Sequence, residues 1–441
     1  MKIQSVNLKN FHGFENRYIE FHENFSVLVG ENGTGKTGIL EGLAVALGAF
    51  LTGLDGVPSI YIKRNQVYTD PVPVDLGGIL HHKEKYPVLV EANGIVNNQK
   101  ITWTRGINKE GGSTTSKDAH QMLNYAKELQ NRLKNDQTVT LPYIGYYGTG
   151  RLWVQRIQRN RSSKTPKKTM VNNRLDGYTN CLSPETNEKI FLNWIEKMTY
   201  IKLQKMREPN VLKAVRRAVE LSSQEWSEID YDINSSELIL SNNQGQTKPF
   251  RLLSDGYRAV IGLVADIAYR MSRLNPHLEE GVVEETPGIV LIDELDMHIH
   301  PKWQKRIVGD LKRTFPRIQF IATTHSPFII QSLNHGELRR LHQQDDDEYV
   351  SSEEFVGKSI EDISESVMEM ESVQRSLKQI EMQITAEKYY KLLEEGMEAD
   401  DKALIEIKNK LDKLEYLFNE DIAYTSFLKM ERLSKGLGDK K

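Results

Sequence analysis

The sequence predicts an α/β fold, with a mixed sheet and flanking helices, and three stretches favour it. Residues 25–29 form a short apolar run that ends in a glycine-rich loop, and an apolar helical pattern follows over residues 36–51. Residues 288–294 and 320–328 are two more apolar runs, which end in acidic or polar side chains. Short apolar runs that alternate with helical periodicity are typical of strands buried in a parallel or mixed sheet.

The N-terminal part of the chain predicts further strands. Residues 2–11 and 16–21 alternate between apolar and polar side chains, which is the pattern of half-buried strands. Residues 86–94 and 99–106 predict a hairpin whose loop is the Asn- and Gly-rich stretch 93–99.

The rest of the chain alternates between helical and strand patterns. A polar helical pattern over residues 117–136 leads into a strand and loop at 141–153, and a second helical pattern covers 188–222. A strand is predicted at 237–242, and a helix begins near residue 254.

Changes of pattern divide the chain into four predicted regions. Beyond residue 345 the composition becomes rich in Glu and Lys and the pattern becomes helical. The regions are the N-terminal part of the α/β head (1–110), a helical and basic insertion (111–225), the C-terminal part of the head (226–345) and a helical C-terminal region (346–441).

Composition favours a protein of the reducing cytoplasm. The chain has 441 residues, a formal net charge of −3 and a single cysteine, so it cannot form an internal disulfide or a cysteine-based zinc site. We find neither a signal-peptide pattern at the N-terminus nor an apolar run long enough to span a membrane. The nearly balanced charge means that any nucleic-acid contact must be local.

Residues 30–37, GENGTGKT, match the phosphate-binding P-loop motif and stand between the predicted strand and helix that the motif requires. The glycines let backbone N–H groups turn toward phosphate oxygens, and the helix N-terminus adds its dipole. The lysine reaches the β- and γ-phosphates of ATP, and the threonine hydroxyl binds Mg²⁺. The predicted nucleotide-binding residues here are Gly30, Asn32, Gly33, Gly35, Lys36 and Thr37.

Three polar side chains at predicted strand ends complete the candidate site. Asp293 would hold Mg²⁺ together with Thr37, and Glu294 would orient or deprotonate the attacking water. His325 ends the next apolar run, where ligands gather in a parallel sheet. It is predicted to contact the γ-phosphate or to hold the catalytic water.

A second stretch, LLSDGYR, also has the features of a phosphate-binding turn. A hydroxyl and a glycine, Ser254 and Gly256, open a predicted helix. In the order P-loop, LLSDGYR, LIDELD and TTHSP, the four motifs resemble the ABC-type P-loop heads of SMC-like and OLD-related AAA family ATPases.

That resemblance explains why one chain carries two such loops. It implies that Ser254 and Gly256 contact the γ-phosphate of ATP held by a second copy, so that two chains dimerise head to tail around ATP. Asp255 departs from the family pattern, which usually has glycine there. Its carboxylate is therefore expected to point away from the phosphate, and slow hydrolysis is expected.

Three shorter stretches add to the resemblance. LKNFHGF at 8–14 is similar to the N-terminal strand and turn that lie near the adenine in the whole family. YYGTGRLW at 146–153 and DELDMHIHPKWQ at 293–304 resemble the branch of defence and OLD-like ATPases. Arg151 either senses the γ-phosphate or is merely the first residue of a basic run. His298 and His300 make a poor zinc site as a pair, and the resemblance places them at the dimer seam.

The short head and helical tail resemble the ATPases of the Septu and retron anti-phage systems. The resemblance implies ATP and Mg²⁺ as cofactors, an even-numbered homo-oligomer, and control of a separately encoded HNH nuclease (PtuB-like). In a retron, a reverse transcriptase and its RNA/DNA product would join the assembly. The alternative is a RecF- or SMC-like ATPase of DNA repair or recombination. The helical pattern of 346–441 predicts no nuclease site in this chain, and the motifs disfavour a transporter cassette.

The stretch from Arg151 to Arg174 carries eight basic residues and no acid, which makes it a candidate contact for nucleic-acid phosphates. Its alternative is a solvated loop. The candidate contact residues are Arg159, Arg161, Lys164, Lys167 and Lys168.

Overall fold

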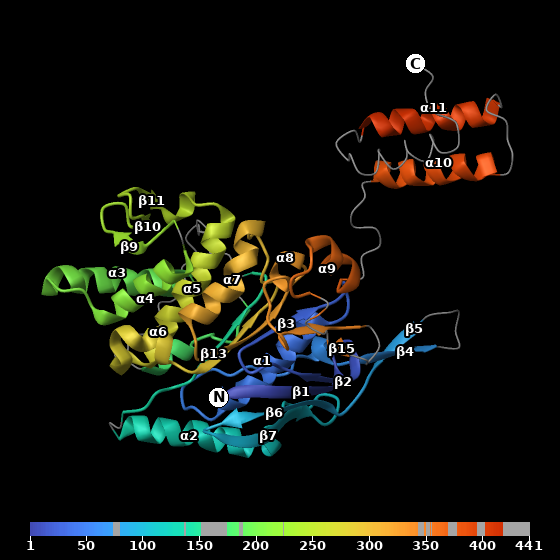
Figure 1. Cartoon of the computed structure of the whole chain (residues 1–441). Helices are drawn as coiled ribbons and strands as arrows, with labels where there is room; N and C mark the ends of the chain where they lie inside the picture. The colour runs from blue at the N-terminus through green and yellow to red at the C-terminus, as the bar shows by residue number, and fades with distance from the viewer. Residues whose placement is uncertain are drawn as a thin grey trace. The chain divides into compact units, whose positions relative to one another are not determined.

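The computed structural model describes most of the chain, in two compact units, Met1–Ile363 and Ser364–Lys441 (Figure 1). The described residues are 1–73, 80–135, 138–150, 174–184, 188–223, 225–342, 348–349, 353, 355–368, 377–394 and 402–417. The four regions predicted from the sequence stay a prediction.

The centre of the first unit is a six-stranded sheet in the order β15-β14-β3-β13-β12-β8. Five neighbouring strands run parallel, and only β15 is antiparallel to its neighbour. The strands are β3 (Phe25–Val29), β8 (Tyr143–Tyr147), β12 (Gly288–Ile292), β13 (Ile318–Thr323), β14 (Leu338–Arg340) and β15 (Glu348–Tyr349). This confirms the predicted α/β fold and brings the C-terminal ends of β3, β12 and β13 side by side.

Helix α1 (Lys36–Thr52) lies between this sheet and a second one. The second sheet is antiparallel in the order β2-β1-β6-β7, with β1 (Lys2–Phe11), β2 (Phe14–Glu20), β6 (Val88–Val96) and β7 (Gln99–Ile107). Almost every residue of α1 is buried, which suits a helix that is apolar on all sides. The P-loop helix is therefore held from both faces.

The hairpin β6–β7 is tighter than the sequence predicted. Its strands continue through Val96 and resume at Gln99, so the turn has only Asn97 and Asn98. Their φ angles of 50° and 60° are left-handed, as a type I′ turn requires, and asparagine tolerates that region. The predicted end of the first strand at residue 94 was too early, because Ile95 and Val96 also pair with the second strand.

The predicted helix at 188–222 is two helices, α3 (Glu188–Lys205) and α4 (Asn210–Ser222). Pro209 stands at the N-cap of α4 and has no N–H to donate, so the first helix cannot continue through it. Met206 takes a left-handed φ of 50° at the break.

Helices α5 (Asp255–Leu274) and α7 (Pro301–Thr314) lie on the side of the six-stranded sheet opposite α1 (Figure 1). Further helices and strands complete this unit. They are β4 (Thr69–Pro73), β5 (Leu80–Glu84), α2 (His120–Lys134), β9 (Glu228–Asp232), β10 (Glu237–Ser241), β11 (Thr247–Pro249), α6 (Val282–Glu285), α8 (Pro327–Ile330) and α9 (Ile360–Ser366).

The described residues of the second unit include the helices α10 (Leu377–Glu394) and α11 (Lys402–Leu417). They share an apolar core made of Met382, Ala386, Tyr389, Leu404, Leu411 and Leu414. The predicted helical character of this region is confirmed for these residues. Within the described part of the chain, none of the helices has the length and apolar character to cross a membrane.

Candidate active site

The candidate site lies where three adjacent parallel strands end. The P-loop, 30–37, follows β3 and opens α1, so Gly30, Asn32 and Gly33 lie in one loop. Asp293 and Glu294 directly follow β12, and His325 follows β13. Because β13 stands between β3 and β12, these groups share one edge of the sheet.

Lys36 is turned back onto its own loop. Its Nζ donates to the carbonyl oxygens of Gly30 at 2.8 Å and Glu31 at 2.7 Å. Burial lowers the pKa of Lys36, while the nearby charges of Asp293 and Glu294 oppose that shift. The Lys36 ammonium therefore bonds two backbone carbonyls of its own loop and lies close to the carboxylates of Asp293 and Glu294.

Gly35 is required by its surroundings. Its φ of 84° is left-handed, and a Cβ at this position would lie 2.2 Å from Cζ of Phe14. Phe14 begins β2, so the N-terminal turn packs directly on the P-loop. A side chain at Gly35 would displace that turn as well as strain the loop.

Asp293 joins the P-loop to the sheet through two hydroxyl groups. Thr37 Oγ1 donates to Asp293 Oδ2 at 2.9 Å, and Thr323 Oγ1 donates to Oδ1 at 2.7 Å. The Asp293 backbone N–H also donates to the Tyr147 carbonyl at 2.8 Å. Asp293 is only 3% exposed, so its carboxylate has a fixed orientation.

Glu294 is held in an unusual backbone conformation. Its φ is 49°, a left-handed value that costs energy for a residue with a side chain. Its N–H donates to Thr323 Oγ1 at 2.7 Å, which supports the turn. Thr323 thus contacts both acidic residues, and sequence reasoning missed it although the TTHSP motif begins there.

His325 stands on a loop anchored by Asp296. The Asp296 carboxylate accepts from the His325 backbone N–H at 3.2 Å and from the Thr324 hydroxyl at 2.5 Å. Burial, followed by the positive charge of Lys36, lowers the pKa of the His325 imidazole. The imidazole therefore favours its neutral form beside the P-loop lysine.

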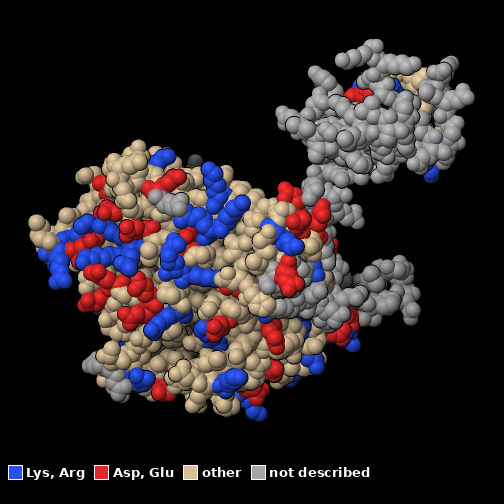
Figure 2. Space-filling view, viewed as in Figure 1, with Lys and Arg blue, Asp and Glu red and all other residues tan. Residues whose placement is uncertain are grey.

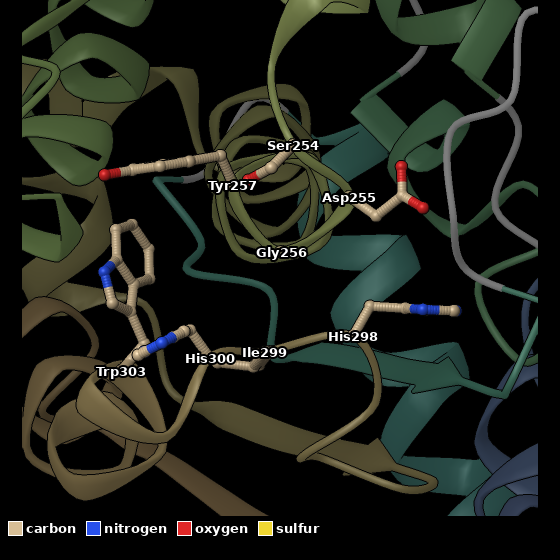
Figure 3. Close-up of a pocket in the computed structure, with 8 residues that line it drawn as sticks. All are labelled: Ser254, Asp255, Gly256, Tyr257, His298, Ile299, His300 and Trp303. Carbon is tan, nitrogen blue, oxygen red and sulfur yellow. The ribbon is translucent and has the colours of Figure 1, made fainter.

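Ser254 and Gly256 lie in a separate pocket of about 390 Å³ (Figure 3). Ser254 is the N-cap of α5, and its hydroxyl makes no capping hydrogen bond. The pocket is lined by the start of α5, by the loop before α7 and by the first turn of α7. The lining residues are Ser254, Asp255, Gly256, Tyr257, His298, Ile299, His300 and Trp303. None of these lining residues belongs to the P-loop of the same chain.

Contacts within the chain shape that pocket. A Cβ on Gly256 would lie 2.7 Å from the His298 carbonyl oxygen, so the glycine lets α5 approach the loop. Sequence reasoning had assigned Gly256 only to a second copy. Tyr257 and Trp303 pack edge to face, with ring centroids 4.6 Å apart. Asp255 accepts from Arg258, which lowers the pKa of its carboxyl.

The two histidines of the pocket point in different directions. In Figure 3 the His298 side chain extends away from His300 and Trp303. His300 Nδ1 accepts from the Lys302 backbone N–H at 3.2 Å, which caps α7. Among the described residues, no three His, Cys, Asp or Glu side chains gather to hold a metal ion.

The basic candidate residues lie outside the described part of the chain. They are Arg151, Arg159, Arg161, Lys164, Lys167 and Lys168. Where side chains are described, Figure 2 shows Lys and Arg interspersed with Asp and Glu over α3, α4 and α6. Ion pairs account for part of this pattern, including Arg216–Glu208 at 2.7 Å and Arg217–Glu284 at 2.9 Å.

Comparisons with known proteins give one family and several relatives. The model of the AAA domain matches residues 5–251. The chain is 26% identical over 403 residues to the retron Ec83 probable ATPase of Escherichia coli, covering 76% of this chain and 70% of the relative. It is 36% identical over 143 residues to the Septu protein PtuA of Bacillus thuringiensis, covering 30% of this chain and 35% of the relative.

A solved structure is also similar. An Smc head bound to the C-terminal winged-helix domain of ScpA aligns with a TM-score of 0.47 and 15% identity, over 80% of this chain and 98% of that one.

Proposed function

We propose that this chain, which belongs to the AAA domain family, is an SMC-like ATPase subunit of an anti-phage defence complex. Two copies would dimerise head to tail around ATP and regulate a separate HNH nuclease. The names of the relatives, a retron probable ATPase and a Septu protein, support the defence assignment. A reverse transcriptase with its RNA/DNA product would join if the system is a retron, and a cytoplasmic location fits such a complex.

One observation carries the ATPase proposal. The Thr37 hydroxyl and the Asp293 carboxylate meet at 2.9 Å, beside the P-loop lysine. Hard oxygen ligands of this kind suit Mg²⁺, which usually binds through one or two protein groups plus phosphate oxygens. Thr37 and Asp293 would hold the ion, and bound Mg²⁺ would neutralise phosphate charge.

The remaining groups would divide the work of hydrolysis. Lys36 would exchange the Gly30 and Glu31 carbonyls for phosphate oxygens, since ammonium–phosphate bonds are stronger. Glu294 would accept a proton from the attacking water. His325, with its lowered pKa, would orient that water or contact the γ-phosphate as a neutral imidazole.

A second copy would complete the site. The free hydroxyl of Ser254 and the first N–H groups of α5 form an N-terminus suited to an anion, and they line an open pocket. Asp255 is neutralised by Arg258, which reduces its repulsion of phosphate. We therefore assign Ser254 and Gly256 to the partner's γ-phosphate, and Arg151 remains a candidate sensor of it.

The C-terminal unit would bind the nuclease. Helices α10 and α11 have a core of their own, and Ile384 and Ile405 remain exposed at 59% and 42%. Deletion of this unit, residues 364–441, should leave ATP binding intact and remove nuclease association, as measured by co-purification. Charge reversal of Lys164, Lys167 and Lys168 should weaken nucleic-acid binding and reduce its salt dependence.

Native mass spectrometry tests the proposal as a whole. The chain would be co-expressed with its neighbouring genes and measured with ATP and Mg²⁺. The proposal predicts an even number of copies of this chain together with a nuclease. A monomer under all conditions would contradict the proposal. An even number of copies without a nuclease would support the ATP-dependent dimer but contradict the nuclease partner.

A further inference from the structure

A buried ion pair lies in the middle of α5, far from its N-terminus. Arg270 Nε donates to Asp266 Oδ2 at 2.8 Å, and the two side chains are 6% and 3% exposed. A buried charge pair is costly to desolvate and strongly destabilising when only one partner is removed. Both residues belong to α5, so the bonds that they make to residues outside this helix connect it to its neighbours.

Tyr147 on β8 bonds to the same carboxylate. Its hydroxyl donates to Asp266 Oδ2 at 2.8 Å and lies 2.8 Å from the Tyr143 hydroxyl. Burial, followed by the negative charge of Asp266, raises the pKa of Tyr147 well above its usual value. The phenol thus keeps its proton and remains a donor to Asp266.

The same tyrosine is bonded to the candidate metal ligand. Its carbonyl oxygen accepts from the Asp293 N–H at 2.8 Å, because β8 and β12 are parallel neighbours. One residue therefore bonds Asp293 through its backbone and α5 through its side chain. On the other side, Arg270 Nη1 donates to the carbonyls of Gly177 and Thr179, at 3.1 and 2.9 Å.

The angle of α5 decides where Ser254 stands. At a rise of about 1.5 Å per residue, about 18 Å of helix separate Asp266 from Ser254. A tilt of about 10° at Asp266 would then move Ser254 by about 3 Å. A misplacement of about 1 Å at a reacting group can lower a rate about 100-fold.

We propose that Tyr147 and Asp266 are positioning residues, which hold Ser254 at the angle needed to reach the γ-phosphate of a second copy's ATP. The inference rests on the proposed function, since it needs Ser254 to act on that phosphate. In this proposal the Tyr147–Asp266 bond helps to form the composite site, which consists of the P-loop of one copy and Ser254 of the other. The bond has no role in the binding of nucleotide to the P-loop.

The test is Tyr147→Phe, which keeps the backbone bond to Asp293 and removes only the hydroxyl. The matched control is Tyr178→Phe, because Tyr178 is fully buried and its hydroxyl donates to the Pro142 carbonyl at 2.5 Å instead of to Asp266. This variant keeps the backbone carbonyls of Gly177 and Thr179, which accept from Arg270. The measurements are the dissociation constant for ATP, the kcat of hydrolysis, ATP-dependent dimerisation and the melting temperature.

We expect the two variants to bind ATP as the parent does and to lose similar thermal stability. Only Tyr147→Phe should lower kcat by about ten-fold or more and weaken dimerisation. Equal kcat in the two variants would overturn the inference. If Tyr147→Phe fails to fold, Tyr143→Phe replaces it. This variant should lower kcat by a smaller factor, and an unchanged kcat would contradict the inference. A parent that neither hydrolyses ATP nor dimerises would instead overturn the proposed function.

Discussion

The P-loop and the loop at the start of α5 differ in how many hydrogen bonds their key side chains make within the chain. In the P-loop, the Lys36 amine bonds two loop carbonyls and the Thr37 hydroxyl bonds Asp293. At the start of α5, Ser254 makes no capping bond, and the loop borders an open pocket. The difference indicates that the P-loop is already ordered to bind ATP, whereas the loop at the start of α5 is left open for ATP held by a second copy.

The largest effect is expected from Lys36→Ala. Its loss removes charge-assisted bonds to phosphate, each worth about 1.5–3 kcal/mol, so ATP affinity should fall about 100-fold or more. Isothermal titration with ATP and Mg²⁺ measures this. The control is Lys305→Ala, which removes a lysine that stands over the Phe328 ring. Equal affinity in both variants would contradict the assignment of the P-loop.

Glu294→Gln should separate binding from hydrolysis. The amide keeps the shape but cannot take a proton, so hydrolysis should fall about 100-fold or more while ATP affinity stays. Light scattering after chromatography with ATP should show a dimer that persists. A variant that turns over ATP at the parental rate would remove Glu294 from the mechanism.

Gly256→Ala should disturb only the second loop. The new methyl group would meet the His298 carbonyl at 2.7 Å, which pushes α5 and the loop apart. We expect unchanged ATP affinity and about ten-fold slower hydrolysis, since positioning errors are costly. Gly309→Ala on α7 is the control, because a Cβ there meets nothing within 4 Å. Similar rates in the two alanine variants would mean that the second loop does not act in hydrolysis.

The pH dependence of hydrolysis should show a smaller effect, which arises from His325 beside the P-loop. The folded-state pKa of His325 lies below its ordinary value of 6.5, so the neutral imidazole persists as the pH falls to that value. If the neutral form is active, activity should decline only below about pH 6.5. His325→Gln should abolish this acidic decline in rate profiles measured between about pH 5 and pH 8. A decline centred well above pH 6.5 would contradict the shift.

The sequence predicted the parts that depend on local pattern. The P-loop, the acids after β12 and the helix after Ser254 follow from residue spacing, because short-range geometry determines them. It did not predict that Thr323 would bond both Asp293 and the Glu294 N–H, since that contact depends on the order of strands in the sheet. The approach of Gly256 to His298 was hidden for the same reason.

The central claim is that the two loops of one site come from two chains, and mixing two inactive variants tests it directly. Lys36→Ala disables the P-loop, and Ser254→Arg blocks the second loop with a bulky side chain. In a head-to-tail dimer of one variant with the other, one composite site has both loops intact. The account predicts that the mixture regains up to about a quarter of the parental hydrolysis, given random pairing into dimers. A mixture that forms mixed dimers yet stays inactive would contradict it.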